Sequence, residues 1–145
     1  MNAFIDTSVL LPCYCEDVFS KAARSAIRQV RPHVSPLVQV EFFAVVAVKV
    51  RTRVITASQG YEMIKMLRLH LAQPALCTIV VTPVDYETAC NWIGSFSTSL
   101  KAADALHLAV ASANNLVLFT ADVDLSKAAE VLGVPFRLIR PQDAQ

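Results

Sequence analysis

The sequence predicts an α/β fold with a mostly parallel central sheet flanked by helices, in three layers. Short apolar, β-rich segments alternate with helical segments along the whole chain, and this order is typical of parallel sheets covered on both faces. Hydrophobic residues make up 54% of the 145 residues, which is enough to bury such a sheet. No repeat or long linker divides the chain, so we expect residues 1–145 to form a single domain.

The first half of the chain is predicted to contain two strands and three helices. In order, they are a strand at Ala3–Ile5, a helix at Val18–Val30, a strand at His33–Ser35, a helix at Leu37–Val50 and a helix that runs through Leu71. The first helix separates apolar and basic residues onto two faces. Ser35 before Pro36 favours a helix start, because proline at the first helical position loses no hydrogen bond. Thr56 or Ser58 can cap the third helix, which ends before Pro74.

The second half is predicted to contain three strands and three helices. In order, they are a strand at Cys77–Thr82, helices at Tyr86–Phe96 and Leu100–Ala113, a strand at Leu116–Phe119, a helix at Val123–Leu132 and a strand at Phe136–Ile139. β-branched residues favour the first of these strands, and Asp85 is expected to cap the helix after it. Asn114 and Asn115 end the alanine- and leucine-rich helix, and Gly133 ends the last helix.

Composition and charge exclude several classes of protein. The high apolar fraction excludes a disordered chain, and the net charge of +1 argues against a protein that coats nucleic acid by bulk charge. The longest segment without charged residues, Ala105–Ala121, is shorter than the ~20 residues that a membrane-spanning helix needs. The N-terminus lacks a basic region and carries Asp6, so no secretory signal is predicted. We therefore expect a cytoplasmic protein whose four cysteines are reduced.

Four acidic side chains are predicted to converge at one edge of the sheet. Asp6 and Asp122 follow predicted strands, and the carboxyl ends of parallel strands form the ligand crevice in such folds. Glu41 and Asp104 each lie alone on an apolar helix, where a carboxylate is costly to bury without a cation or hydrogen-bond donors. Taken singly, each acid could instead be a helix cap or a partner in a structural ion pair.

Two divalent cations would balance the charge of four converging carboxylates. Carboxylate oxygens suit Mg²⁺ or Mn²⁺, and such ions can activate water and stabilise both oxygens of an in-line phosphoryl displacement. The sequence has no Gly-rich phosphate loop. The acids therefore predict metal-dependent hydrolysis of phosphodiesters.

Four segments resemble, in order, the motifs of PIN domains. They are Phe4–Leu10, Ser35–Glu41, Leu100–Ala109 and Phe119–Asp122. Each motif alone is weak, whereas the ordered set covers nearly the whole chain and is specific. The size and layout are similar to those of the VapC toxins of VapBC toxin–antitoxin pairs.

This resemblance implies a PIN-like fold and a Mg²⁺- or Mn²⁺-dependent endoribonuclease that leaves a 5′-phosphate and a 3′-hydroxyl on its RNA substrate. It also implies an antitoxin partner. It places Asp6, Glu41, Asp104 and Asp122 as the catalytic, metal-binding acids. The hydroxyl of Thr120 would orient Asp122 or a metal-bound water.

Four further residues lie close to these acids in the sequence. Asp124 is a possible outer ligand, and the roles of Thr7 and Ser8 are open. His107 lies three residues after Asp104 on the same helix face, where we expect it to form a hydrogen bond or to pack rather than to bind metal.

Two other functions compete with a nuclease. A non-catalytic PIN-like binding or scaffold module is the alternative, because a sequence does not report activity. A phosphatase of the haloacid dehalogenase type is disfavoured, since it needs a second aspartate where this chain has Ser8.

The predicted surface has basic and apolar features. The basic residues form two clusters, Lys21, Arg24, Arg28 and Arg31 on one helix and Lys49, Arg51 and Arg53 near the end of another. These clusters could attract RNA phosphates or simply be solvated. The high mean hydropathy predicts exposed apolar surface, which favours a homodimer.

Overall fold

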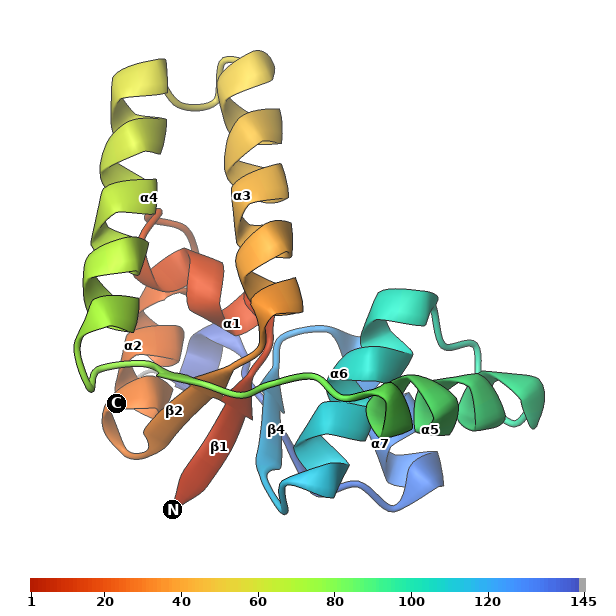
Figure 1. Ribbon diagram of the computed structural model, residues 1–145. Helices are drawn as coiled ribbons and strands as arrows, with labels where there is room; N and C mark the ends of the chain where they lie inside the picture. The colour runs from red at the N-terminus through yellow and green to blue at the C-terminus, as the bar shows by residue number, and fades with distance from the viewer. Residues whose placement is uncertain (144–145) are drawn as a thin grey trace.

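The computed structural model describes residues 1–143, in which five parallel strands form one sheet between two layers of helices (Figure 1). The strands are β1 (Asn2–Ile5), β2 (Arg31–Val34), β3 (Cys77–Thr78), β4 (Val117–Thr120) and β5 (Phe136–Leu138). Their order in the sheet is β3-β2-β1-β4-β5. Because β1 pairs with β2 on one side and β4 on the other, the carboxyl ends of β1 and β4 lie next to each other. The predicted fold class is confirmed.

Helices cover both faces of the sheet within the described residues. They are α1 (Thr7–Leu10), α2 (Ser20–Arg28), α3 (Pro36–Arg51), α4 (Ala57–Ala72), α5 (Pro83–Gly94), α6 (Ala102–Ala113) and α7 (Val123–Leu132), with short 3₁₀ turns η1 (Leu11–Cys13) and η2 (Pro141–Asp143). α1 and α2 lie on one side of the sheet, and α6 and α7 lie on the other (Figure 1). None of the helices in residues 1–143 is both long enough and apolar enough to span a bilayer.

The core lies between the sheet and these helices. The side chains of Phe4, Ile5, Leu118 and Phe119 on the two central strands are fully buried. Burying each such side chain stabilises the fold by about 1.5–3 kcal/mol. This tightly packed centre fixes the residues that directly follow β1 and β4.

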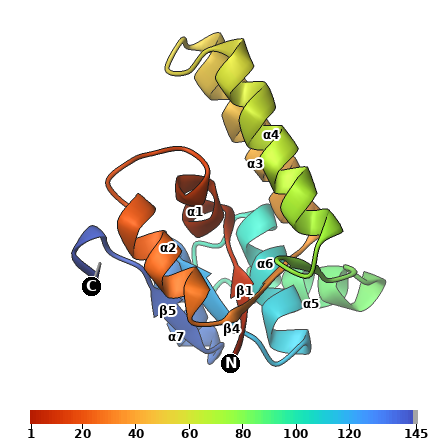
Figure 2. The same ribbon diagram turned by 90° about the vertical axis from the view of Figure 1, so that its left-hand side faces the viewer.

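α3 and α4 form an antiparallel hairpin that projects from the body of the molecule (Figures 1 and 2). α3 begins as predicted, because the Ser35 side chain accepts the backbone N–H of Val38 and Pro36 is the first helical residue. α4 begins after Thr56, which forms a capping box with Gln59. The first turns of α3 therefore stay beside the sheet, while its far end extends into solvent.

The predicted strand at Cys77–Thr82 is wrong beyond Thr78. The Thr82 hydroxyl and backbone N–H both donate to Asp85 Oδ2, at 2.9 and 2.7 Å, and α5 begins at Pro83. Proline at the first helical position and this capping box outweigh the β propensity of the preceding residues. Asp85 is consequently inside the first turn and is not the cap, and α5 ends at Gly94, before the predicted Phe96.

Other predicted boundaries shift by one or two residues, and one helix was not predicted. α2 begins at Ser20 instead of Val18, because Asp17 and Ser20 form a hydrogen-bonded turn before it. β2 ends at Val34, since Ser35 is used as the cap of α3. α6 begins two residues later than predicted, at Ala102. The four-residue helix α1 follows β1 directly and has too few residues to show a helical period.

Candidate metal centre

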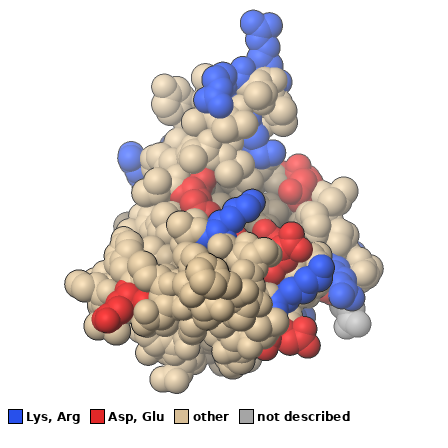
Figure 3. Space-filling view, turned by 90° about the vertical axis from the view of Figure 1, so that its right-hand side faces the viewer, with Lys and Arg blue, Asp and Glu red and all other residues tan. Residues whose placement is uncertain are grey.

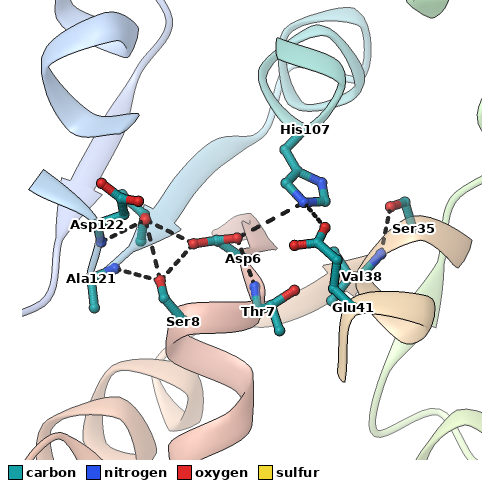
Figure 4. Close-up of polar contacts among 10 residues, drawn as sticks. Asp6, Thr7, Ser8, Ser35, Val38, Glu41, His107, Ala121 and Asp122 are labelled. Atoms are coloured by element: carbon teal, nitrogen blue, oxygen red, sulfur yellow. Dashed lines mark hydrogen bonds and ion pairs between the residues drawn. The ribbon is translucent and has the colours of Figure 1, made fainter. Parts of the chain in front are cut away.

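Asp6 lies at the carboxyl end of β1 and is only 5% exposed. Its backbone N–H donates to the carbonyl of Phe119 at 3.0 Å, which ties it to β4. Its Oδ1 accepts the N–H of Thr7 at 2.7 Å, and its Oδ2 accepts the hydroxyls of Ser8 at 2.5 Å and Thr120 at 2.9 Å (Figure 4). These three donors compensate for burial of the charge and fix the orientation of the carboxylate.

Thr120 and Ser8 connect the two central strands. Thr120 is fully buried at the end of β4, and its hydroxyl oxygen accepts the N–H of Asp122 at 3.0 Å while donating to Asp6. The Ser8 hydroxyl oxygen accepts the N–H of Ala121 at 2.9 Å (Figure 4). Both hydroxyls therefore hold the backbone before Asp122 in a fixed position relative to the Asp6 carboxylate. Sequence reasoning left the role of Ser8 open, and its only signal was its place two residues after Asp6.

Asp122 is exposed and is the N-cap of α7. Its Oδ1 accepts the backbone N–H groups of Asp124 at 2.8 Å and Leu125 at 3.1 Å. The capping role that was considered as an alternative is therefore present in the structure. Asp124, a possible outer ligand, has a side chain that is 84% exposed and lies 3.7 Å from the Lys127 ammonium. The structure does not bring Asp124 to the other acids.

Glu41 and His107 lie near Asp6 although they belong to two helices that are far apart in the sequence, α3 and α6. Glu41 lies in the first turns of α3 with a side chain 30% exposed, and its Oε1 is hydrogen-bonded to Nε2 of the buried His107 on α6. The same Nε2 lies 4.0 Å from Asp6 Oδ1. His107 thus forms both kinds of contact expected of it, a hydrogen bond to Glu41 and packing against Phe4. One ligand atom from each of the three residues lies within 4.8 Å of the others, so together they could hold a metal ion (Figure 4).

Asp104 lies half-buried in the first turn of α6, one turn before His107. Burial raises the pKa of its carboxyl, and the charges of Asp6, Asp122 and Glu41 raise it further, against a smaller opposite effect of His107. Asp104 is not among the three residues with the closest ligand atoms. It nevertheless lies in the field of the other three acids, so all four predicted acids act on the same region. Figure 3 shows acidic side chains around a hollow on this face of the molecule.

The pKa of His107 responds to the same negative field. Burial alone lowers this pKa, but the hydrogen bond to Glu41 and the charges of Glu41, Asp6 and Asp104 together outweigh burial and raise it. The donor set thus consists of carboxylate oxygens and one imidazole nitrogen around an excess of negative charge. Such a set fits a divalent cation, which both neutralises the charge and uses these atoms as ligands.

We expect a Thr120→Val variant to fold with lower stability. Valine keeps the volume of the buried side chain but leaves the Asp122 N–H without its acceptor and removes one donor from Asp6. A hydrogen bond to a charged group contributes about 1.5–3 kcal/mol, and urea unfolding measures its loss. An unchanged free energy of unfolding would show that the hydroxyl does not hold the two strands together.

Comparison with known proteins identifies the family. The model of the PIN domain family matches residues 3–131, a span that includes all four acids and Thr120. The chain belongs to the PIN domain family. A search of curated proteins found no significant match.

Solved structures of toxin–antitoxin systems share the fold of this PIN domain. A chain of VapBC2 from Rickettsia felis, bound to a promoter DNA fragment, has a TM-score of 0.70 at 13% identity and covers 97% of this chain and 100% of its own. VapC20 of Mycobacterium tuberculosis, described as a sarcin–ricin loop cleaving toxin, has a TM-score of 0.68 at 19% identity. This match covers 87% of this chain and 94% of that one. A toxin–antitoxin complex from Klebsiella pneumoniae has a TM-score of 0.64 at 20% identity, and the match covers 86% of this chain and 90% of that one. The chain thus has the fold of VapC-type toxins.

Proposed function

We propose that this PIN domain is a divalent-metal-dependent endoribonuclease and the toxin of a toxin–antitoxin pair. The observation that carries the proposal is the cluster of Asp6, Glu41 and His107 beside the adjoining ends of β1 and β4. Asp104 lies close enough for the charges of Asp6, Asp122 and Glu41 to raise its pKa, which supports a site of four acids. No positive side chain other than His107 approaches Asp6, Glu41 or Asp104 as an ion-pair partner in the described residues. Three acids that share a single histidine as their cationic partner keep an excess of negative charge, which is suited to bind a cation.

The four acids would hold Mg²⁺ or Mn²⁺, directly or through water. A bound ion of this kind lowers the pKa of a water and offsets the charge that builds on the scissile phosphate. The protein's own part is positioning: Ser8 and Thr120 fix Asp6, and the cap of α7 fixes Asp122. Attack by water on the phosphorus, with the bond to the 3′-oxygen breaking and that oxygen taking up a proton, would leave a 5′-phosphate and a 3′-hydroxyl on RNA.

The test is cleavage of transfer and ribosomal RNA by the purified protein in Mg²⁺ or Mn²⁺, compared with EDTA. We expect cleavage that EDTA abolishes and that added metal restores. Cleavage that survives EDTA would contradict the mechanism. If the protein shows no cleavage and no metal binding, the result would favour the alternative function, a PIN-like scaffold module without catalysis.

Basic residues at the projecting tip of the hairpin are suited to contact the RNA backbone. Lys49 and Arg51 lie in the last turn of α3, and Arg53 lies in the turn after it. Figure 3 shows basic side chains gathered at this tip, above the acidic hollow. On α2, by contrast, Arg24 is paired with Glu16 at 2.8 Å. We therefore assign phosphate contacts to the tip rather than to α2.

A second copy of the chain is suited to cover an apolar stripe on α3. The stripe consists of Val40, Ala44, Ala47 and Val48, all exposed and all on one helix face by their spacing. Val40 is 65% and Val48 is 44% exposed. Small residues in the middle of the stripe would let two such helices approach closely, so we assign the stripe to a homodimer.

We expect an Ala47→Arg variant to be monomeric at micromolar concentration. A charged side chain in the centre of the stripe would be desolvated in a dimer without a partner. Light scattering measures the mass, which should be twice the chain mass for the natural protein and equal to it for the variant. A monomeric natural protein, or a dimeric variant, would contradict this interface.

A groove away from the acids is suited to an antitoxin segment. It has a volume of about 830 Å³ and lies between η1, α2 and α4, with apolar lining from Leu10, Ile27, Met63 and Met66. Met66 is 39% exposed there. The structures that share the fold include toxins in complex with antitoxins. An apolar helical face of the antitoxin would bury these side chains.

We expect a Met66→Glu variant to escape its antitoxin while keeping nuclease activity. The new carboxylate would lie against the apolar part of the groove and oppose docking, and none of the four proposed site acids lines this groove. The probe is the protein encoded beside this gene, produced together with each toxin variant. Co-purification and inhibition should occur with the natural chain and fail with the variant. Equal binding by both chains would rule out the groove as the docking site.

A further inference from the structure

His107 is a buried imidazole whose polar contact is directed at the acids. It is 1% exposed, and its Nε2 is hydrogen-bonded to Glu41 and lies 4.0 Å from Asp6 Oδ1. Its Nδ1 has no hydrogen-bond partner within residues 1–143. The ring also packs against Phe4, and its Nε2 is the nitrogen that faces Glu41 and Asp6 (Figure 4).

The three ligand atoms lie near one another, at separations comparable to those in the coordination shell of a small dication. Ligand atoms at 2.0–2.2 Å from one ion are separated by about 3 Å when adjacent and about 4 Å when opposite. The atoms of Asp6, Glu41 and His107 lie within 4.8 Å of one another, and His107 Nε2 and Asp6 Oδ1 are 4.0 Å apart. Small movements of these side chains, with Nε2 releasing to solvent the proton that it donates to Glu41, would bring all three atoms around one ion.

We propose that His107 Nε2 is a direct ligand of the cation, together with the carboxylates of Asp6 and Glu41. This inference rests on the proposed metal-dependent function and goes beyond it, because it determines which metal the site selects. Mg²⁺ takes oxygen ligands almost exclusively, whereas first-row transition dications accept imidazole nitrogen as well as carboxylate. The site therefore selects a transition dication over Mg²⁺, and Mn²⁺ is the probe of choice.

The direct test is pulsed electron paramagnetic resonance of Mn²⁺ bound to a chain in which His107 is the only histidine. The His33→Gln and His70→Gln changes achieve this, since His33 contacts the Arg31 carbonyl and His70 the Tyr14 hydroxyl, both outside the acid site. We expect nitrogen modulation from a directly bound imidazole. Bound Mn²⁺ without nitrogen modulation overturns the inference, and RNA cleavage by the same sample would show that the nuclease proposal survives.

A second variant tests the metal preference. His107→Leu replaces the buried ring with an apolar side chain, and circular dichroism checks that it folds. The Mg²⁺ concentration that displaces half of the bound Mn²⁺ should fall by about tenfold relative to His33→Gln, the matched control. An unchanged displacement concentration would mean that His107 only positions Glu41 and is not a ligand. A natural chain that neither binds Mn²⁺ nor cleaves RNA would instead refute the proposed function itself.

Discussion

The Asp104→Asn variant should lose RNA cleavage by about a thousandfold or more while keeping its fold. Asparagine has nearly the shape of aspartate but lacks the charge that would hold a cation beside Asp6 and Glu41. Metal ions contribute several kcal/mol to the stabilisation of a phosphoryl-transfer transition state, and about 4 kcal/mol corresponds to a thousandfold in rate. Initial rates of cleavage in saturating Mg²⁺ or Mn²⁺ measure the loss.

Asp124→Asn is the matched control for this experiment. Asp124 has the same side chain, also lies in the first turn of a helix, and is exposed beside Lys127 rather than among the acids. We expect it to cleave RNA at close to the natural rate. Full activity of Asp104→Asn, or equal losses in both variants, would contradict the assignment of Asp104 to the metal site.

In EDTA, Asp104→Asn should unfold at a higher temperature than the natural chain. The folded state raises the pKa of Asp104, through burial and the charges of Asp6, Asp122 and Glu41. A carboxyl whose pKa is higher in the folded than in the unfolded state destabilises the fold at pH 7, where it must ionise. A neutral asparagine removes that cost. Thermal unfolding followed by circular dichroism measures the difference.

Added Mn²⁺ should reverse this order of stability. Binding to the folded state alone stabilises it in proportion to the logarithm of the ion concentration over Kd, and only the natural site has its full ligand set. The natural chain should then melt above Asp104→Asn, whereas Asp124→Asn should follow the natural chain with and without the ion. A natural chain that is the more stable of the two in EDTA would mean that the four acids do not repel one another.

The sequence predicted those parts of the site that depend on position along the chain. Asp6 and Asp122 could be placed at one edge because residues that follow adjacent parallel strands must lie together. Contacts between segments that are distant in the sequence could not be predicted in this way. The Ser8 hydroxyl accepts a backbone N–H from Ala121, and His107 meets Glu41 across 66 positions of sequence. Such contacts depend on how α1, α3 and α6 pack, which no local pattern encodes.

The errors in the predicted fold have a similar cause. β-branched residues favoured a strand through Thr82, but its hydroxyl and backbone N–H bind Asp85 and start α5 instead. The capping role of Asp122 was considered as an alternative to metal binding, and the structure shows that the cap is real. One carboxylate oxygen forms that cap, so capping and metal binding are not mutually exclusive at this residue.

The chemical ends of the RNA products test the central claim most directly. Attack by a metal-activated water on the phosphorus, with the 3′-oxygen as the leaving group that takes up a proton, leaves a 5′-phosphate and a 3′-hydroxyl. Attack by the neighbouring ribose 2′-hydroxyl, which needs no metal-held water, would leave a 2′,3′-cyclic phosphate and a 5′-hydroxyl. Mass spectrometry of the fragments released by the natural chain in Mn²⁺ distinguishes the two. We predict 5′-phosphate and 3′-hydroxyl ends, and cyclic phosphate ends would contradict the proposed role of the four acids.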